Sequence, residues 1–112
     1  MGLSGYLFGK SAESDACDFL QKEGCQILDR NFSCKFGEID IIAKKDEILH
    51  FVEVKATQGD YEASYRLTGS KMQKILKAVD YYLLKNGLNS DFQVDLITIE
   101  SNKINWIKNI SL

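Results

Sequence analysis

Apolar residues recur along this chain with two different spacings, and these spacings separate predicted helices from predicted strands. Over residues 11–23 and 70–86 the apolar side chains return every three or four positions, which is typical of helices with one buried face. Each stretch begins at a serine, and Gly24 and Gly87 follow as the expected helix ends. Residues 1–10 contain three glycines and are expected to form a loose N-terminal arm.

Five shorter runs of apolar and β-branched residues predict strands. They cover residues 26–31, 38–44, 48–55, 92–99 and 104–110. A tight turn near Lys45 and Asp46 separates the second run from the third, so we expect a hairpin in the middle of a sheet. Residues 56–69 show no periodicity, and a loop of this length is typical of a lid or a binding loop. The predicted order α-β-β-β-α-β-β indicates one α/β domain over residues 1–112, with a mixed sheet flanked by helices.

Carboxylates interrupt both strands of the predicted hairpin. Asp40 and Glu53 lie within apolar runs, where a charge needs a cation or another partner. A two-residue turn at positions 45–46 would place Glu38 opposite Glu53, with Asp40 diagonal to it. A four-residue turn ending at Ile48 would place Asp40 directly opposite Glu53. Both turns put the carboxylates on one face of the sheet, whereas a three-residue turn would separate them.

This set of residues fits a site for a divalent metal ion. Two neighbouring carboxylates repel each other unless a cation lies between them, and oxygen ligands without His or Cys favour Mg²⁺ or Mn²⁺. We expect Asp40 and Glu53 to hold the ion, with Glu13, at the edge of the apolar face of the first helix, as a further ligand. Lys55 shares a strand face with Glu53 and could orient an attacking water and stabilise charge on a phosphoryl group. In the alternative, Lys55 only neutralises one of the carboxylates.

These residues also resemble a known family. The resemblance is carried by Glu13, by F-G-E-I-D-I-I-A at residues 36–43 and by F-V-E-V-K at residues 51–55. This pattern is similar to the YraN-like family of small bacterial proteins, which in turn is similar to archaeal Holliday-junction resolvases and PD-(D/E)xK nucleases. The resemblance covers about the first half of the chain and implies a restriction-endonuclease-like core in which Glu13, Asp40, Glu53 and Lys55 form the catalytic set. Ile39 stands where the motif has a proline, but that proline shapes the backbone and binds no metal.

The second predicted helix carries a basic face. Lys74, Lys77 and Tyr81 lie opposite its apolar face, and Lys71 near its start is expected closer to the hairpin. Lysines in a line with an aromatic ring can follow the phosphates of a nucleic acid, with DNA as the expected partner. The alternative is an ordinary solvated helix face. Because the net charge of the chain is −2, any attraction for a polyanion must rest on a local patch of this kind.

Cysteine usage and hydropathy indicate the compartment. The three cysteines lack Cys-x-x-Cys spacing and are expected to be buried thiols, and no apolar run is long enough to cross a membrane, which together predict a cytoplasmic protein. The main functional hypothesis is an endonuclease-like protein, dependent on Mg²⁺ or Mn²⁺, that binds and cleaves DNA, with branched or flapped forms as candidates. The alternatives are an inactive nucleic-acid-binding module of the same fold and a protein-interaction domain in which Glu53 and Lys55 form a structural ion pair. Because one active centre cuts one strand, a homodimer is also considered.

Overall fold

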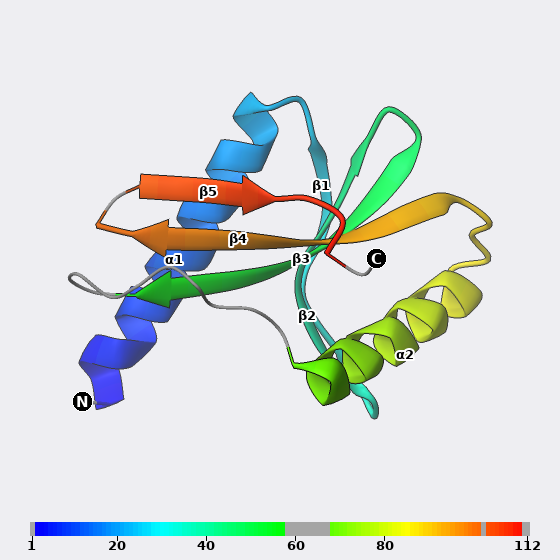
Figure 1. Cartoon of the computed structure of the whole chain (residues 1–112), viewed down its shortest axis with the longest axis horizontal. Helices are drawn as coiled ribbons and strands as arrows, with labels where there is room; N and C mark the ends of the chain where they lie inside the picture. Colours follow the sequence, from blue (N-terminus) through cyan, green and yellow to red (C-terminus); the bar gives the residue numbers. More distant parts are fainter. Residues whose placement is uncertain (1, 58–67, 102, 111–112) are drawn as a thin grey trace.

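Helices and strands follow one another in the predicted order in the computed structural model, which describes residues 2–57, 68–101 and 103–110 (Figure 1). The elements are α1 (Gly2–Lys22), β1 (Gln26–Cys34), β2 (Gly37–Lys45), β3 (Ile48–Thr57), α2 (Gly69–Lys85), β4 (Asp91–Glu100) and β5 (Lys103–Ile107). This confirms the order α-β-β-β-α-β-β. Of the predicted loop over residues 56–69, residues 58–67 lie outside the described part of the chain, and the remaining positions belong to β3 or to the start of α2.

Helix α1 begins at Gly2, so the prediction of a loose arm was wrong for residues 2–10. Each glycine disfavours a helix by about 1 kcal/mol relative to alanine. However, extending an existing helix gains one hydrogen bond for each residue that is ordered, whereas starting a helix is costly. The glycines are therefore tolerated next to a helix that residues 12–22 already hold in place. Neither described helix combines the length and the apolar character needed to cross a membrane.

The strands form one sheet in the order β1-β2-β3-β4-β5. Strands β3 and β4 run parallel, and the other neighbours in the sheet are antiparallel. Helix α2 connects the two parallel strands, because a parallel pair needs a crossover that returns the chain to the same end of the sheet. A mixed sheet flanked by helices in this order is consistent with a restriction-endonuclease-like fold.

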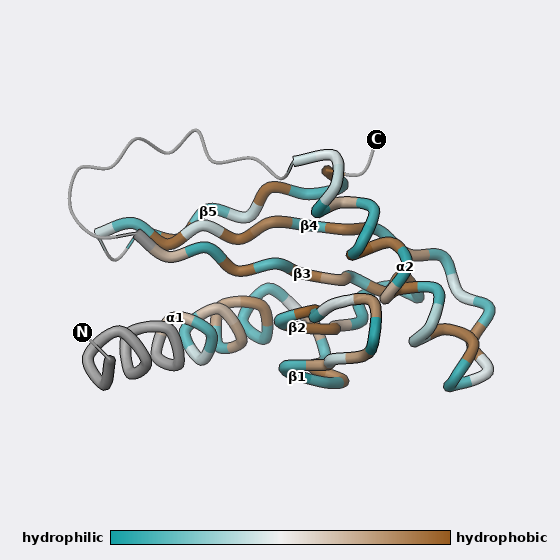
Figure 2. The backbone as a smooth tube through the Cα atoms, turned by 90° about the horizontal axis from the view of Figure 1, so that it is seen from below, coloured by the Kyte–Doolittle hydropathy of each residue, from teal (hydrophilic) through white to brown (hydrophobic). Residues whose placement is uncertain are grey.

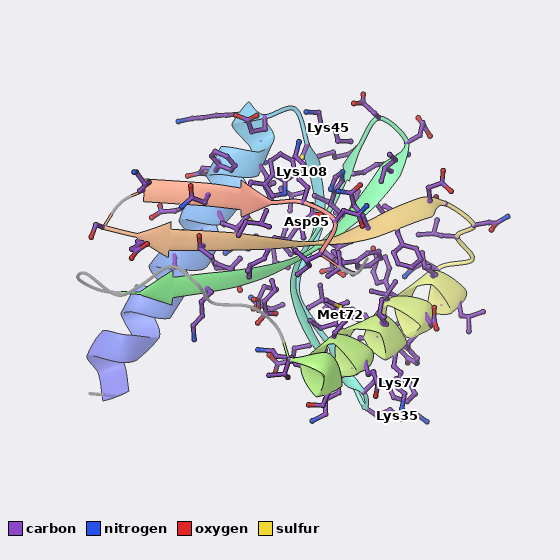
Figure 3. All side chains as sticks on the ribbon, in the orientation of Figure 1. Lys35, Lys45, Met72, Lys77, Asp95 and Lys108 are labelled. Atoms are coloured by element: carbon purple, nitrogen blue, oxygen red, sulfur yellow. The ribbon has the colours of Figure 1, made fainter. Side chains whose placement is uncertain are left out.

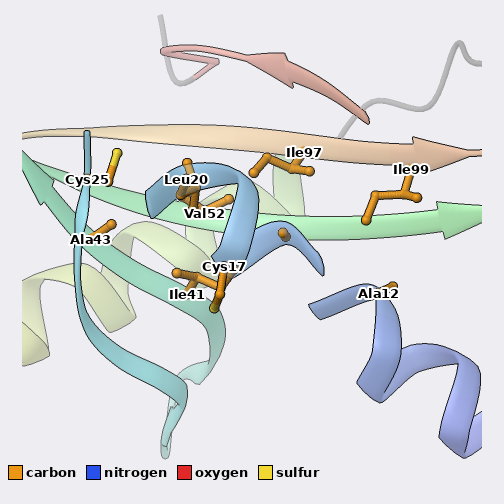
Figure 4. Close-up of a cluster of buried hydrophobic side chains, with 10 residues drawn as sticks. Ala12, Cys17, Leu20, Cys25, Ile41, Ala43, Val52, Ile97 and Ile99 are labelled. Carbon is orange, nitrogen blue, oxygen red and sulfur yellow. The ribbon is translucent and has the colours of Figure 1, made fainter. Parts of the chain in front are cut away.

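The two helices cover opposite faces of the sheet. Helix α1 buries Cys17 and Leu20 in a cluster with Val52 (Figure 4), whereas α2 buries Val79 in a second cluster around Phe51. Adjacent residues of a strand point to opposite faces, so neighbouring positions of β3 serve the two cores in turn. Figure 2 shows hydrophobic residues along β3 and β4, which lie in the interior of the sheet and are covered on both sides. Glu53 is two positions after Phe51 and therefore lies on the α2 side.

A buried carboxylate holds the C-terminal segment against the sheet. Asp95 in β4 is fully buried and accepts hydrogen bonds from Trp106 Nε1 at 2.9 Å, from the backbone N–H of Asn109 at 2.8 Å and from Gln93 Nε2 at 2.9 Å. The side chain of His50 is a further partner, with its Nδ1 2.6 Å from Asp95 Oδ2. Burial raises the pKa of Asp95, but the hydrogen bonds of His50, Asn109, Gln93 and Trp106 outweigh burial and lower the pKa below its ordinary value.

Candidate functional site

The hairpin of β2 and β3 sets the positions of two acidic side chains. The strands pair in one register as far as Ile41 and Val52, and the next positions in that register are Asp40 and Glu53. This is the register of the turn ending at Ile48, in which the two carboxylates come from directly opposed positions. The sequence had left this choice of turn open.

Strands β2 and β3 pair from Ile41 to Lys45 and separate on the N-terminal side of Ile41. We call this point the strand fork. Strand β2 stays paired with β1 and turns toward α2, whereas β3 continues beside β4 (Figure 1). At the strand fork, where β2 no longer pairs with β3, the backbone N–H of Val54 donates a hydrogen bond to Asp40 Oδ2 at 2.8 Å. The side chain of Asp40 therefore substitutes for a strand partner, and this hydrogen bond fixes the direction of its carboxylate.

A cavity of about 360 Å³ opens between the strand fork and the first turns of α2. It is lined by Gly37, Glu38, Asp40, Glu53, Ser70, Lys71, Lys74 and Ile75. Three acidic residues of β2 and β3 thus line one open space beside two lysines of α2. The volume is at the lower end of the range for small-ligand sites in proteins, which is enough for a phosphodiester group and a hydrated ion.

Lys71 forms an ion pair inside this cavity, a contact that the sequence did not predict. Its Nζ lies 3.0 Å from Glu53 Oε2, and the side chain of Glu53 is only 14% exposed. The position of Lys71 follows from the start of α2, where Thr68 is the N-cap and its Oγ1 accepts a hydrogen bond from the backbone N–H of Lys71 at 3.2 Å. The sequence had placed Lys71 near the hairpin as a nucleic-acid contact, and its distance to Glu53 adds a second task, which is to hold that carboxylate.

The pKa of Asp40 is raised from 3.8 to about 7. Burial is the main cause, and the nearby carboxylate of Glu53 is the second, since two like charges in little water disfavour ionisation. The hydrogen bond from Val54 and the ammonium of Lys71 act in the opposite direction, and Glu13 adds a smaller repulsion. A cation bound between the two carboxylates would offset their repulsion and favour the ionised form of Asp40.

Glu13 approaches this acidic pair from α1. It is 8% exposed and pairs with Arg30 of β1, whose Nη2 lies 3.4 Å from Glu13 Oε1 and also donates to Ser14 Oγ at 3.2 Å. Glu13 influences the pKa of Asp40, but it is not among the described residues that line the cavity. Glu13 thus contributes to the electrostatics at Asp40 while it forms its own ion pair with Arg30.

Of the remaining predicted residues, Lys74 lines the cavity, and the others are not among its described lining residues. Lys55 is exposed on β3, opposite Thr98 of β4, and is not one of the described lining residues. Lys74 does line the cavity, and Lys77 and Tyr81 follow it along α2 on the exposed side of that helix. Lys71 therefore lies near the hairpin, as expected, and Lys74 lies there as well, although the sequence placed it only on the basic face of the helix.

The donor set fits Mg²⁺ or Mn²⁺ better than an ion that needs a full set of protein ligands. Among residues 12–56, 68–101 and 103–110, no three Asp, Glu, His or Cys side chains converge closely enough to form a metal site by themselves. Mg²⁺ commonly keeps several waters and takes only one or two carboxylates from the protein. Asp40 and Glu53 supply two carboxylates to one cavity, which matches this preference.

One part of the surroundings was not predicted. The turn between β1 and β2, at Lys35 and Phe36, packs beside α2, with the ring of Phe36 6.3 Å from the ring of Tyr81. Figure 3 labels Lys35 and Lys77 at this same corner of the molecule. Pairing of strands far from this turn decides where the turn lies. The only local signal was an aromatic residue beside a lysine at a position where a turn is normally polar.

The comparisons with a family model and with individual proteins agree on one family. Residues 12–99 match the model of a family described as Uncharacterised protein family UPF0102. A UPF0102 protein of Campylobacter jejuni (strain 81-176) is 60% identical over 111 residues, which is 99% of each chain. UPF0102 proteins of Campylobacter concisus and Campylobacter lari are 58% and 54% identical, over 100% and 99% of each chain. These names state no activity, substrate or partner.

Proposed function

The chain belongs to the uncharacterised protein family UPF0102, and we propose that it is a nuclease that hydrolyses nucleic-acid phosphodiester bonds with the help of Mg²⁺ or Mn²⁺. One observation carries this proposal. Asp40 and Glu53 come from opposed positions of separating strands and face one open cavity that also contains lysines. A purely structural acidic pair gains nothing from an opening of this size, whereas a phosphodiester needs room, a cation and positive charge.

In this proposal Asp40 and Glu53 hold the ion, which when bound activates water and offsets charge on the phosphate. The hydrogen bond from Val54 keeps Asp40 oriented before any ion arrives, so the ligand loses little freedom on binding. Lys71 holds Glu53 and can give up that contact to a phosphate oxygen. Glu13, repelling Asp40 from the other side, favours capture of a cation.

Lys55 has the task of stabilising charge that develops on the phosphoryl group. It is exposed next to the site, on the strand that carries Glu53, so a phosphate lying across the cavity mouth would come within its reach. The proposed substrate is DNA in the cytoplasm, with branched or flapped forms as candidates and with two copies of the chain cutting two strands.

A second candidate is a module of the same fold that binds nucleic acid without cleaving it. The ion pair of Lys71 with Glu53 favours this reading, because at 3.0 Å the ammonium already neutralises one of the two carboxylates. The proposal and this alternative differ in a single measurable property, which is the appearance of cleaved product.

Metal binding and cleavage are tested separately. Calorimetric titration with Mn²⁺ should give heat for the wild type, and Asp40→Asn and Glu53→Gln should abolish it. Glu47→Gln, an exposed acid at the far end of the same hairpin, serves as the control. Cleavage is then measured on four-way junctions, flaps and single strands in Mn²⁺, with Lys55→Ala and Asp40→Asn in parallel. Products that persist undiminished in Asp40→Asn would identify a contaminating nuclease, and absence of products on every substrate would leave the binding module.

A further inference from the structure

A line of basic and aromatic side chains leads along α2 to the cavity, and the turn between β1 and β2 runs beside it. We call this surface the α2 track and define it by Lys35, Phe36, Lys74, Lys77 and Tyr81. We infer that the α2 track binds an unpaired strand of nucleic acid and feeds it toward the acidic residues. This inference rests on the proposed function and deepens it by naming the substrate class.

The helix supplies the spacing of the track. Lys74, Lys77 and Tyr81 are three and four positions apart, so they lie on one side of α2, and all three are exposed. The rise of a helix places Tyr81 about 15 Å along the axis from Lys71, which already contacts Glu53. A backbone that follows these residues therefore arrives at the cavity.

The turn between β1 and β2 adds the second side of the track. A side-chain carbon at Gly37, the residue after this turn, would lie 3.8 Å from Lys74 Cβ, so the chain passes close beside the helix here. Lys35 Nζ lies 5.3 Å from the centre of the Phe36 ring, and that ring lies 6.3 Å from the ring of Tyr81. Charge and aromatic surface are thus combined at one place, as in proteins that stack the bases of single strands while their lysines follow the phosphates.

This contact also argues against a duplex. A helix that reads double-stranded DNA must enter a groove about 12 Å wide, which requires both flanks of the helix to be accessible. One flank of α2 is covered by the turn, and the opposite side of the helix is buried on the sheet through Ile75 and Val79. The accessible part of α2 is therefore a narrow surface, which suits the backbone of one nucleic-acid strand. Among the described residues of this part of α2, Asp80 is the exposed acid, and three lysines of the track outnumber it.

The inference predicts a binding that needs neither metal nor cleavage. Fluorescence anisotropy with an oligothymidylate of about 15 nucleotides, a length within the usual site sizes, is measured in EDTA and compared with a blunt duplex of equal length. We expect tighter binding of the single strand. The logarithm of its affinity should fall with the logarithm of salt concentration with a slope of about −2, as three released counterions predict for a single strand.

Variants separate stacking from charge. Tyr81→Leu should weaken binding roughly 5- to 150-fold, the range for loss of one stacked base, while Tyr81→Phe keeps the ring and should bind like the wild type. Lys77→Gln should reduce the salt slope by about 0.7. Lys103→Gln, an exposed lysine on edge strand β5, is the matched control and should change nothing. Because Tyr81 packs on Phe36, circular dichroism confirms that Tyr81→Leu is folded, and Lys77→Gln tests the track without touching this packing.

The inference and the proposed function can fail independently. Equal affinity for duplex and single strand, or Tyr81→Leu and Lys77→Gln that both bind like the wild type, would overturn the inference even if DNA is cleaved. Equal competition by polyglutamate at the same charge would also overturn it, since the surface would then recognise charge alone. Tight single-strand binding that needs Tyr81, without cleavage on any substrate, would support the track and refute the nuclease.

Discussion

Replacement of Asp40 by asparagine should make the protein more stable at pH 8 and leave its stability almost unchanged near pH 4. Asparagine has the same shape, and its side-chain oxygen can still accept the hydrogen bond from the N–H of Val54. It differs from aspartate in carrying no charge at any pH. The comparison therefore isolates the free energy of holding an ionised and largely buried Asp40 beside Glu53.

The expected sign follows from the raised pKa of Asp40, which is about 7 in the folded protein against 3.8 ordinarily. Below about pH 4, Asp40 is protonated whether the chain is folded or not, and its contribution to stability is fully present. Between these two values the unfolded chain loses the proton first, so stability falls by about 1.4 kcal/mol per pH unit until the folded pKa is passed.

The magnitude follows from the same two values. A pKa of about 7 instead of 3.8 corresponds to about 4 kcal/mol, and water entering the open cavity reduces this, so we expect Asp40→Asn to be about 2–4 kcal/mol more stable at pH 8. Urea unfolding in EDTA at pH 4 and pH 8, followed by far-ultraviolet circular dichroism, measures the difference at each pH. Glu38→Gln, the exposed acid at the rim of the cavity, is the control for removing a charge.

Two results would refute this reasoning. A stability difference between Asp40→Asn and wild type that is equal at both pH values would show that the carboxylate is not strained by its surroundings. A wild type that is more stable than Asp40→Asn at pH 8 in EDTA would show that ionised Asp40 has a stabilising partner. If Mn²⁺ binds at the site, adding it at pH 8 should reduce the difference in stability between Asp40→Asn and the wild type. Only the wild type would bind the ion, and a ligand at 100 times its Kd stabilises the folded protein by about 2.7 kcal/mol.

Three further substitutions test other parts of the structure. Lys71→Met removes the partner of Glu53 and should change stability by less than about 1 kcal/mol, since this lysine is half exposed. Nuclear magnetic resonance titration should show a higher pKa of Asp40 in this variant, and a lower pKa would contradict the assigned contact. Asp95→Ala leaves several buried donors unsatisfied and should lower the free energy of unfolding in urea by about 3 kcal/mol or more, with altered fluorescence of the single tryptophan. A loss below about 1 kcal/mol would mean that these hydrogen bonds contribute little. Leu20→Ala opens a cavity under α1 and should cost about 2–5 kcal/mol, and a neutral result would show that α1 does not pack as described.

The acidic pair could be predicted because strand periodicity is local. Alternation of side chains puts Asp40 and Glu53 on predictable faces of their strands, and the short turn leaves only a few possible registers. Lys71 was assigned to the neighbourhood of the site but not to Glu53. Its direction depends on where α2 begins, and the helix starts at Gly69 with Thr68 as its cap rather than at the serine that follows.

The sequence by itself determined the order of helices and strands, the presence of one buried face on each helix and the acids that interrupt the hairpin, because spacing and charge act over a few residues. Only the tertiary structure decided that β2 pairs with β3 only from Ile41 onward, that Lys71 reaches Glu53, and that the turn at Phe36 meets Tyr81. These contacts join segments far apart in the chain. They depend on the twist of the sheet and on how α2 packs across it, and no local pattern encodes either one.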